Sequence, residues 1–233
     1  LADLESIERR LEQTRKRAAS KDKESLTVLP VMEDVVKLLQ DGKPARLLLK
    51  TLAPEDIAIL KGLNLLTSHP VLYVCNVAEG DAATGNSFTA QVEKMAKEQG
   101  AECVIISAAI EAEVAQLPDE ESQEFLAALG LEEAGLDRLI RAGYHLLDLI
   151  TYFTVGPKET RAWTIKRGTK APAAAGVIHS DFERGFIRAQ TIAYDDYIAL
   201  GGEVGAKEAG KARDEGKEYV VQDGDVLLFK FNT

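Results

Sequence analysis

The sequence predicts an α/β protein that combines a helical hairpin, a strand–helix–strand unit and a C-terminal mixed sheet. Apolar residues recur every three or four positions over residues 1–11 and 26–39, which indicates amphipathic helices. Two β-branched runs, HPVLYVCNV at 69–77 and ECVIISA at 102–108, indicate strands. Beyond Thr151 the chain is rich in strand-forming residues, which Gly, Pro and Asp turns divide.

Residues 1–45 are predicted to form an antiparallel coiled-coil α-hairpin. The segment 20–24 is polar and lacks the apolar stripe, so it marks the turn, and the sequence DGKP at 41–44 ends the second arm. The helix faces look too polar to fill a core. We therefore expect the hairpin to protrude or to pack on a partner.

Residues 46–149 are predicted to form part of a parallel α/β domain. A helix over about 87–99 joins the strands at 69–77 and 102–108 into a right-handed βαβ unit. Continuous β-branched runs are typical of strands buried on both faces, so full burial is expected. Residues 111–137 hold nine acidic and no basic residues, which predicts a solvated, negative helical surface.

Residues 150–233 are predicted to form a ubiquitin-like β-grasp module. Short helices are expected at 171–178 and 194–200. The β-prone segments are TYFTV, ETRAWTIKRG, GFIRAQTIAY, EYVVQ and DVLLFKF.

The charge of the chain is unevenly distributed. The net charge of −10 argues against a protein that binds nucleic acid over its whole surface. Residues 158–188 nevertheless hold seven basic against three acidic residues, a sum of +4, which leaves −14 for the rest of the chain. With Trp163 and Phe186 interleaved, this segment is the best candidate for an RNA-contacting face, and a solvated sheet surface is the alternative. The candidate residues are Lys158, Arg161, Lys166, Arg167, Lys170, Arg184 and Arg188.

Other classes of site find little support. No apolar stretch reaches the length of about 18 residues that spans a bilayer, and no signal peptide is visible, so a cytoplasmic protein without membrane contact is expected. Cys75 and Cys103 lack metal-ligand or disulfide spacing and are interpreted as buried thiols, with redox regulation through Cys75 as a weaker alternative. Ser180 and Glu183 have the spacing of a helix capping box.

The segment GAKEAGKA at 205–212 has the glycine and lysine spacing of a phosphate-binding loop. Such a loop needs a strand before it, a helix after it, and a Ser or Thr hydroxyl for magnesium. Ala212 stands at the hydroxyl position, and a predicted helix and loop precede the segment. We therefore predict a surface loop here.

A better candidate for nucleotide binding lies at the carboxyl ends of the two strands, where α/β sheets place ligand-contacting loops. Asn76, Val77 and Glu79 belong to a loop that compares with the N-K-x-D loop of guanine-binding G domains, in which the aspartate accepts hydrogen bonds from guanine. The longer glutamate displaces the acceptor oxygens, and valine replaces the lysine beside the base. Ser107 and Ala108 compare with the S-A-x loop that completes such a pocket. Ordinary strand-end loops are the alternative.

The chain resembles the YchF / Obg-like ATPase family over essentially all of its 233 residues. The resemblance is carried by NVAE at 76–79, by TYFTVG at 151–156, by the long segment from KETRAWTIKRG to YDDYI, by GAKEAGKARDEGKEYVVQDGD and by FKFN. These are translation-associated P-loop NTPases with a TGS domain. The resemblance implies part of a G-domain parallel sheet with a coiled-coil hairpin insertion, followed by a TGS domain of the β-grasp type.

The resemblance also implies a function. ATP is expected in preference to GTP, with Mg²⁺ as cofactor and the ribosome or ribosomal RNA as partner. In the family, the phosphate loop, the magnesium-binding threonine and the switch regions precede the coiled coil, and nothing in this sequence matches them. We expect them upstream of Leu1 and expect the chain alone to be inactive. A non-enzymatic RNA- or ribosome-binding adaptor with a degenerate nucleotide pocket is the rival hypothesis.

Overall fold

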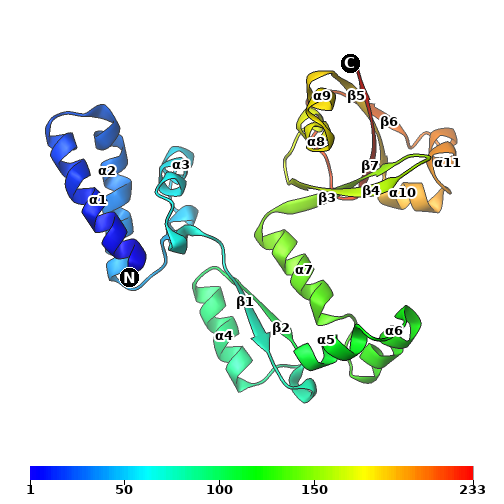
Figure 1. The fold of residues 1–233 in the computed structure, drawn as a ribbon, viewed down its shortest axis with the longest axis horizontal. Helices are drawn as coiled ribbons and strands as arrows, with labels where there is room; N and C mark the ends of the chain where they lie inside the picture. Colours follow the sequence, from blue (N-terminus) through cyan, green and yellow to red (C-terminus); the bar gives the residue numbers. More distant parts are fainter. Residues whose placement is uncertain (233) are drawn as a thin grey trace. The chain divides into compact units, whose positions relative to one another are not determined.

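The computed structural model describes residues 1–232, and the chain divides into two compact units (Figure 1). Residues 1–142 form the N-terminal unit, and the C-terminal unit begins at Gly143. This boundary falls inside a helix, and the predicted division at 45/46 and 149/150 stays a prediction. Within the described residues, no helix combines the length and the apolar character that a membrane crossing requires.

The N-terminal unit is mostly helical and contains one pair of strands. Its elements are α1 (Ala2–Ala19), α2 (Lys23–Gln40), α3 (Pro54–Gly62), β1 (Leu72–Asn76), α4 (Ser87–Glu98), β2 (Glu102–Ile106), α5 (Ala108–Val114), α6 (Asp119–Ala128) and α7 (Gly135–Leu146), of which α7 continues into the second unit. Three short 3-10 helices lie between them, at Ala45–Lys50, Leu66–Ser68 and Glu79–Asp81.

The helical hairpin is confirmed, and it contains more of the core than its polarity predicts. Asp22 begins α2, and its carboxylate accepts a hydrogen bond from the Ser25 backbone N–H at 2.9 Å. One apolar stripe from each helix is enough to build a core with the segment that follows the hairpin, so the expectation that the helix faces are too polar to fill a core is wrong. The buried cluster consists of Ile7, Leu11, Val31, Met32, Val35, Val36, Ala45, Leu60, Leu63 and Leu65.

The βαβ unit is also confirmed, but its strands are not fully buried. β1 and β2 are parallel and in register from the pair Leu72 and Glu102 to the pair Asn76 and Ile106. Every residue of β2 is only half-buried, and the Val74 side chain on β1 is 45% exposed. The described residues contribute only these two strands to the sheet, so each strand lacks a neighbour on one edge. The apolar runs are therefore partly exposed.

The C-terminal unit is a five-stranded mixed sheet with helices on both faces. Strand order is β4-β3-β7-β5-β6, with β3 parallel to β7 and the other neighbours antiparallel. The elements are β3 (Leu149–Val155), β4 (Thr160–Lys166), α8 (Ala171–Ile178), α9 (Ser180–Arg184), β5 (Phe186–Ala193), α10 (Tyr194–Ala199), α11 (Glu203–Glu208), β6 (Arg213–Glu215) and β7 (Asp225–Phe231).

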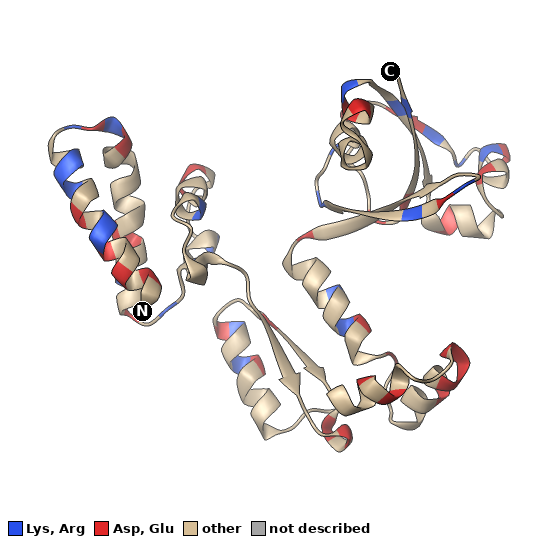
Figure 2. Ribbon diagram, viewed as in Figure 1, with Lys and Arg blue, Asp and Glu red and all other residues tan. Residues whose placement is uncertain are grey.

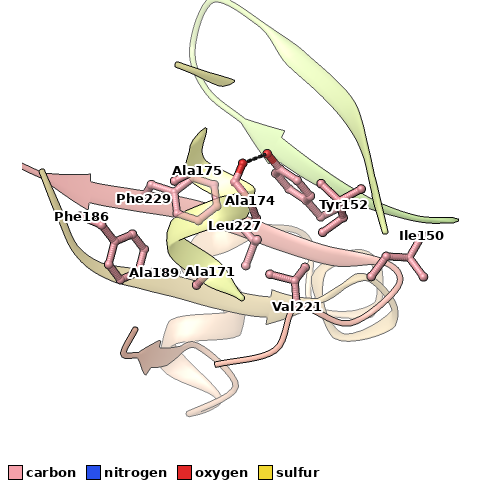
Figure 3. Close-up of a cluster of buried hydrophobic side chains, with 11 residues drawn as sticks. Ile150, Tyr152, Ala171, Ala174, Ala175, Phe186, Ala189, Val221, Leu227 and Phe229 are labelled. Carbon is pink, nitrogen blue, oxygen red and sulfur yellow. Dashed lines mark hydrogen bonds between the residues drawn. The ribbon is translucent and has the colours of Figure 1, made fainter. Parts of the chain in front are cut away.

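The main core of this unit lies between the sheet and α8 (Figure 3). Tyr152 is fully buried, and its hydroxyl donates a hydrogen bond to the Ala174 carbonyl at 2.9 Å. Its ring meets Phe229 edge to face, with centroids 5.9 Å apart. Alanines on the inner face of α8 let the helix approach the sheet closely. On the opposite face, α10 and α11 cover a smaller cluster that contains Ile192 and Val226.

The structure differs from the sequence predictions at residues 205–212 and at the start of α9. The segment 205–212 is not a loop, because most of it belongs to helix α11 and the turn that ends it. Helix α9 is not capped by Ser180, which is its first residue. Its N-cap is His179, whose Nδ1 accepts a hydrogen bond from the Asp181 backbone N–H at 3.2 Å.

Candidate nucleotide-base site

The two strand-end loops predicted to bind a base are joined by a direct hydrogen bond. Asn76 is the last residue of β1, and its side-chain Oδ1 accepts a hydrogen bond from the Ala108 backbone N–H at 2.9 Å. A second bond, from the Val77 N–H to the Ile106 carbonyl at 2.9 Å, extends the strand pairing by one step. Asn76 and Ala108 are both exposed, so the joined loops form a rim that a ligand can reach.

Glu79 lies on this rim in a short 3-10 helix, Glu79–Asp81, and is exposed to solvent. The next residues anchor that helix to α4. The Asn86 side-chain amide donates to the Asp81 carboxylate at 2.8 Å, while Asn86 also caps α4 in a capping box with Thr89. The backbone around Glu79 is therefore held on both sides, by the strand pairing at Val77 and by the hydrogen bond to Asp81.

The Val77 side chain is packed and the Ser107 side chain is buried, so both contribute less directly to a base site than the motif comparison predicts. The Val77 side chain packs against the cluster of Ala82, Ile110, Leu126 and Leu131, beneath the loop. Ser107 is 2% exposed and precedes α5, and within the described residues its hydroxyl has no hydrogen-bond partner. Val77 thus supports the loop through its side chain, and Ser107 is buried directly before Ala108.

Glu111 is a supporting residue that the sequence comparison missed. Its carboxylate accepts hydrogen bonds from the backbone N–H groups of Gly135 at 2.7 Å and Leu136 at 3.1 Å. These are the first residues of α7, so Glu111 neutralises the positive end of that helix and ties it to α5. A contact across 24 residues leaves no local pattern in the sequence.

The cysteines lie on the same strands. Cys75 and Cys103 are half-buried, with their sulfur atoms 3.6 Å apart. Cys103 is in register with Tyr73, two positions from Cys75, so the thiols are diagonal neighbours. A spacing of about 4.8 Å between strands and two residues along a strand separate the two Cα atoms by about 8 Å, beyond ordinary disulfide geometry. Their burial is less complete than predicted.

Within the described residues, neither the segment GAKEAGKA nor a cluster of His, Cys, Asp or Glu side chains offers a phosphate or metal site. In GAKEAGKA, the Lys211 Nζ lies 3.3 Å from an Asp196 carboxylate oxygen, and no strand precedes the segment. Among residues 1–232, no group of three or more His, Cys, Asp or Glu side chains is placed to hold a metal ion. Among the described residues, no such donor set is therefore available for magnesium.

Comparison with known proteins supports the predicted family. The family model YchF-GTPase_C, described as "Protein of unknown function (DUF933)", matches residues 149–232. The "Ribosome-binding ATPase YchF" of Bacillus subtilis is 51% identical over 234 residues, which cover the whole chain and 63% of that protein. The "Obg-like ATPase 1" of Oryza sativa subsp. japonica is 40% identical, over the whole chain and 59% of that protein. A solved structure of the Schizosaccharomyces pombe YchF GTPase matches 98% of the chain and 62% of its own, with a TM-score of 0.86 and 34% identity. The chain belongs to the YchF family.

This YchF-family chain spans 63% of the length of the Bacillus relative and 59% of the rice relative. The match to the Schizosaccharomyces YchF structure confirms the predicted α/β fold. A GTP-binding protein of Pyrococcus horikoshii matches 78% of the chain and 51% of its own, with a TM-score of 0.51 and 16% identity, which is a likeness of fold alone.

The basic residues that the sequence groups together in this YchF-family chain are mostly paired with acids. Three of the acidic partners, Asp148, Asp214 and Glu218, lie outside residues 158–188 in the sequence and approach them only in the fold. The charge count of that segment therefore omits them. The pairs are Arg161 with Glu159 (3.9 Å), Arg167 with Asp148 (3.2 Å), Lys170 with Glu218 (2.5 Å), Arg188 with Asp214 (3.2 Å), and Arg184 with Asp181. Lys158 and Lys166 have no such pair within the described residues. The local positive charge is therefore smaller than +4.

The aromatic residues of this segment are also less available than predicted. Phe186 is 5% exposed and belongs to the main core, so it cannot stack on a base. Trp163 is half-buried, its indole N–H donates to the Thr154 hydroxyl at 2.9 Å, and the Arg161 guanidinium lies 4.1 Å from its ring centroid. One ring face is thus already covered by a cation. The RNA-binding role of this segment stays a prediction.

Proposed function

We propose that this chain supplies the base-recognising part of a nucleotide site in a ribosome-associated protein that binds and hydrolyses ATP in preference to GTP. The observation that carries the proposal is the hydrogen bond from the Ala108 N–H to the Asn76 side chain, which joins two loops at the carboxyl edge of parallel strands. The names of the relatives, "Ribosome-binding ATPase YchF" and "Obg-like ATPase 1", support the same activity.

The residues of the rim have distinct roles in this proposal. Asn76 holds the two loops together by accepting the Ala108 N–H, and the backbone of Ser107 and Ala108 closes one side of the base pocket. Glu79 presents a carboxylate on a side chain one methylene longer than aspartate. A guanine-binding carboxylate must accept two hydrogen bonds at a fixed distance, so the longer chain disfavours guanine. Val77 packs beneath the loop and leaves the base without the lysine stem of guanine-binding loops.

Phosphate and magnesium binding are assigned to the intact protein. Within the described residues nothing holds the β- and γ-phosphates, so this chain by itself is not expected to hydrolyse ATP. Ribosome or RNA contact is assigned to the hairpin and the C-terminal unit. Of the seven candidate residues there, Lys158 and Lys166 have no acidic partner within the described residues. A ribosome-bound protein is expected in the cytoplasm, which is the localisation that the proposal assigns.

The test is an equilibrium titration of labelled ATP and GTP against the intact gene product and against this chain. ATP should bind the intact product more tightly than GTP, and Asn76→Ala should weaken both nucleotides by at least tenfold, or about 1.4 kcal/mol. Glu79→Asp combined with Val77→Lys should move the preference toward GTP. Absence of ATP binding by the intact product would favour the alternative, a ribosome-binding adaptor with a degenerate pocket.

A further inference from the structure

A groove lies between α5, α6 and the start of α7. Its volume is about 910 Å³. Leu126 and Leu131 form its floor and are almost fully buried, while Leu136 stands on its wall with 53% of its surface exposed. An exposed leucine beside an apolar floor leaves a surface that a partner's apolar side chains can cover. We call this feature the acidic groove, because of the charges described next.

The charges that line the groove have one sign. Figure 2 shows acidic residues clustered along α5 and α6, and residues 111–137 contain nine acidic and no basic residues. Glu111 and Glu133 are engaged within the fold, by the start of α7 and by Arg141 respectively. Asp119 and Glu132 are exposed and make no hydrogen bond or ion pair within the described residues. Their charge is therefore available to a partner.

This combination of charge and apolar surface selects one class of occupant. Phosphate backbones and anionic lipid surfaces are repelled by the carboxylates. A bound metal ion does not fit, because the described residues offer no group of three ligands. A protein segment that carries lysine and arginine around apolar anchors matches both the rim and the floor.

We propose that the acidic groove is a docking site for a basic, amphipathic segment of a partner protein. Apolar side chains of the partner pack on Leu136 and the groove floor, and its lysine or arginine side chains meet Asp119 and Glu132. The proposal does not rest on nucleotide binding, because the docking surface is argued from the exposed side chains of Leu136, Asp119 and Glu132, none of which belongs to the rim. The groove floor does touch the rim from beneath, since Val77 packs on the cluster that contains Leu126 and Leu131.

The probe is a fluorescein-labelled peptide of about fourteen residues, four helical turns of leucine and lysine in an amphipathic pattern. Its binding to the 233-residue chain is measured by anisotropy at two salt concentrations. Binding should weaken as salt rises. Asp119→Asn combined with Glu132→Gln should weaken it about tenfold and reduce its salt dependence, and Leu136→Ala should weaken it by several fold. Glu98→Gln, which removes a charge that is also exposed but lies outside the groove, should leave it unchanged.

Two further probes make the result decisive. A lysine-only peptide of the same charge should bind at least tenfold more weakly, since it lacks apolar anchors, and a leucine and glutamate peptide should not bind. Amide chemical-shift changes on adding the leucine and lysine peptide should cluster at α5, α6 and the start of α7. Equal affinity for the two basic peptides, equal loss in the Glu98 control, or shifts elsewhere on the chain would overturn the proposal.

Discussion

Among single residues, Asp3 makes the densest set of polar contacts at the base of the hairpin. Its buried carboxylate accepts hydrogen bonds from the Leu66 N–H at 2.9 Å, the Thr67 N–H at 2.7 Å and the Thr67 hydroxyl at 2.6 Å. Burial raises the pKa of Asp3, but these three bonds outweigh burial and hold the pKa below its ordinary value of 3.8. Asp3 thus fixes the start of α1 to the segment that leads into β1.

Replacing Asp3 with alanine is expected to lower the free energy of unfolding of the N-terminal unit by about 2–4 kcal/mol, because two backbone donors lose their acceptor. Because the folded pKa is depressed, this contribution is fully present above about pH 4 and is lost as the pH falls through the folded pKa. Urea unfolding followed by circular dichroism at pH 7 and pH 3 measures the difference. Asp34→Ala, at an exposed position of α2, is the control. A deficit that is equal at both pH values would contradict the assigned role.

The Cys103 thiol is expected to react slowly in the folded chain. Burial, followed by the hydrogen bond and charge of Cys75, raises the pKa of Cys103 to about 11. At pH 8 only about one thiol in a thousand is then ionised, and the thiolate is the reactive form. Alkylation by iodoacetamide, followed by mass spectrometry of the Cys103 peptide, should be far slower than in urea-unfolded chain and should accelerate up to about pH 11. Equal alkylation rates at pH 8 in the folded and the urea-unfolded chain would contradict this prediction and would favour redox regulation at this strand.

At the scale of residues, the sequence predicts which residues form the candidate rim but not which residues support it. Asn76 and Ala108 could be placed together because the ends of adjacent parallel strands meet at one edge. The inward direction of Val77 depends on the pleat of β1 and on a cluster formed by later helices. Glu111 and its partners at the start of α7 are 24 residues apart, so only the fold brings them together.

At the scale of elements, the contact between α10 and α11 depends on a glycine. A Cβ atom added at Gly205 would lie 1.9 Å from the Leu200 carbonyl oxygen, and that backbone cannot move without shifting the helix. Gly205→Ala should therefore destabilise the C-terminal unit by about 2–4 kcal/mol. Gly216→Ala, where an added Cβ meets nothing within 4 Å, should have little effect. Urea unfolding followed by Trp163 fluorescence measures both, and matching midpoints for the two variants would show that the helices can separate.

Elements with a strong apolar period were predicted well, and so were the short helices at 171–178 and 194–200. Two short segments that tertiary contacts define were not. The segment EYVVQ looks like a strand, but it forms only an isolated bridge between Val220 and Lys170. The buried Asp225 carboxylate holds it as a turn, accepting hydrogen bonds from the Tyr219 hydroxyl at 2.7 Å and the Gln222 N–H at 2.9 Å. β6 escaped prediction because its three residues, Arg213–Glu215, are charged, as edge strands often are.

At the scale of the whole molecule, each unit has hydrophobic clusters of its own. The clusters around Leu60 and Ile110 draw only on residues of the N-terminal unit, and those around Tyr152 and Ile192 draw only on the C-terminal unit. Trp163 is the single tryptophan of the chain, so its fluorescence reports the C-terminal unit alone. Far-ultraviolet circular dichroism is dominated by helices, and most helices lie in the N-terminal unit.

Separate clusters predict that the two signals respond to different mutations. Leu60 is fully buried, and Leu60→Ala should cost about 2–5 kcal/mol, moving the circular dichroism transition to lower urea while the fluorescence transition stays in place. Tyr152→Phe removes the bond to the Ala174 carbonyl and should lower the fluorescence midpoint by the equivalent of about 1–2 kcal/mol. The dichroism change from the N-terminal helices should stay in place. If either substitution shifted both signals equally, the two units would unfold as one cooperative structure, because coincident transitions are the signature of two-state behaviour.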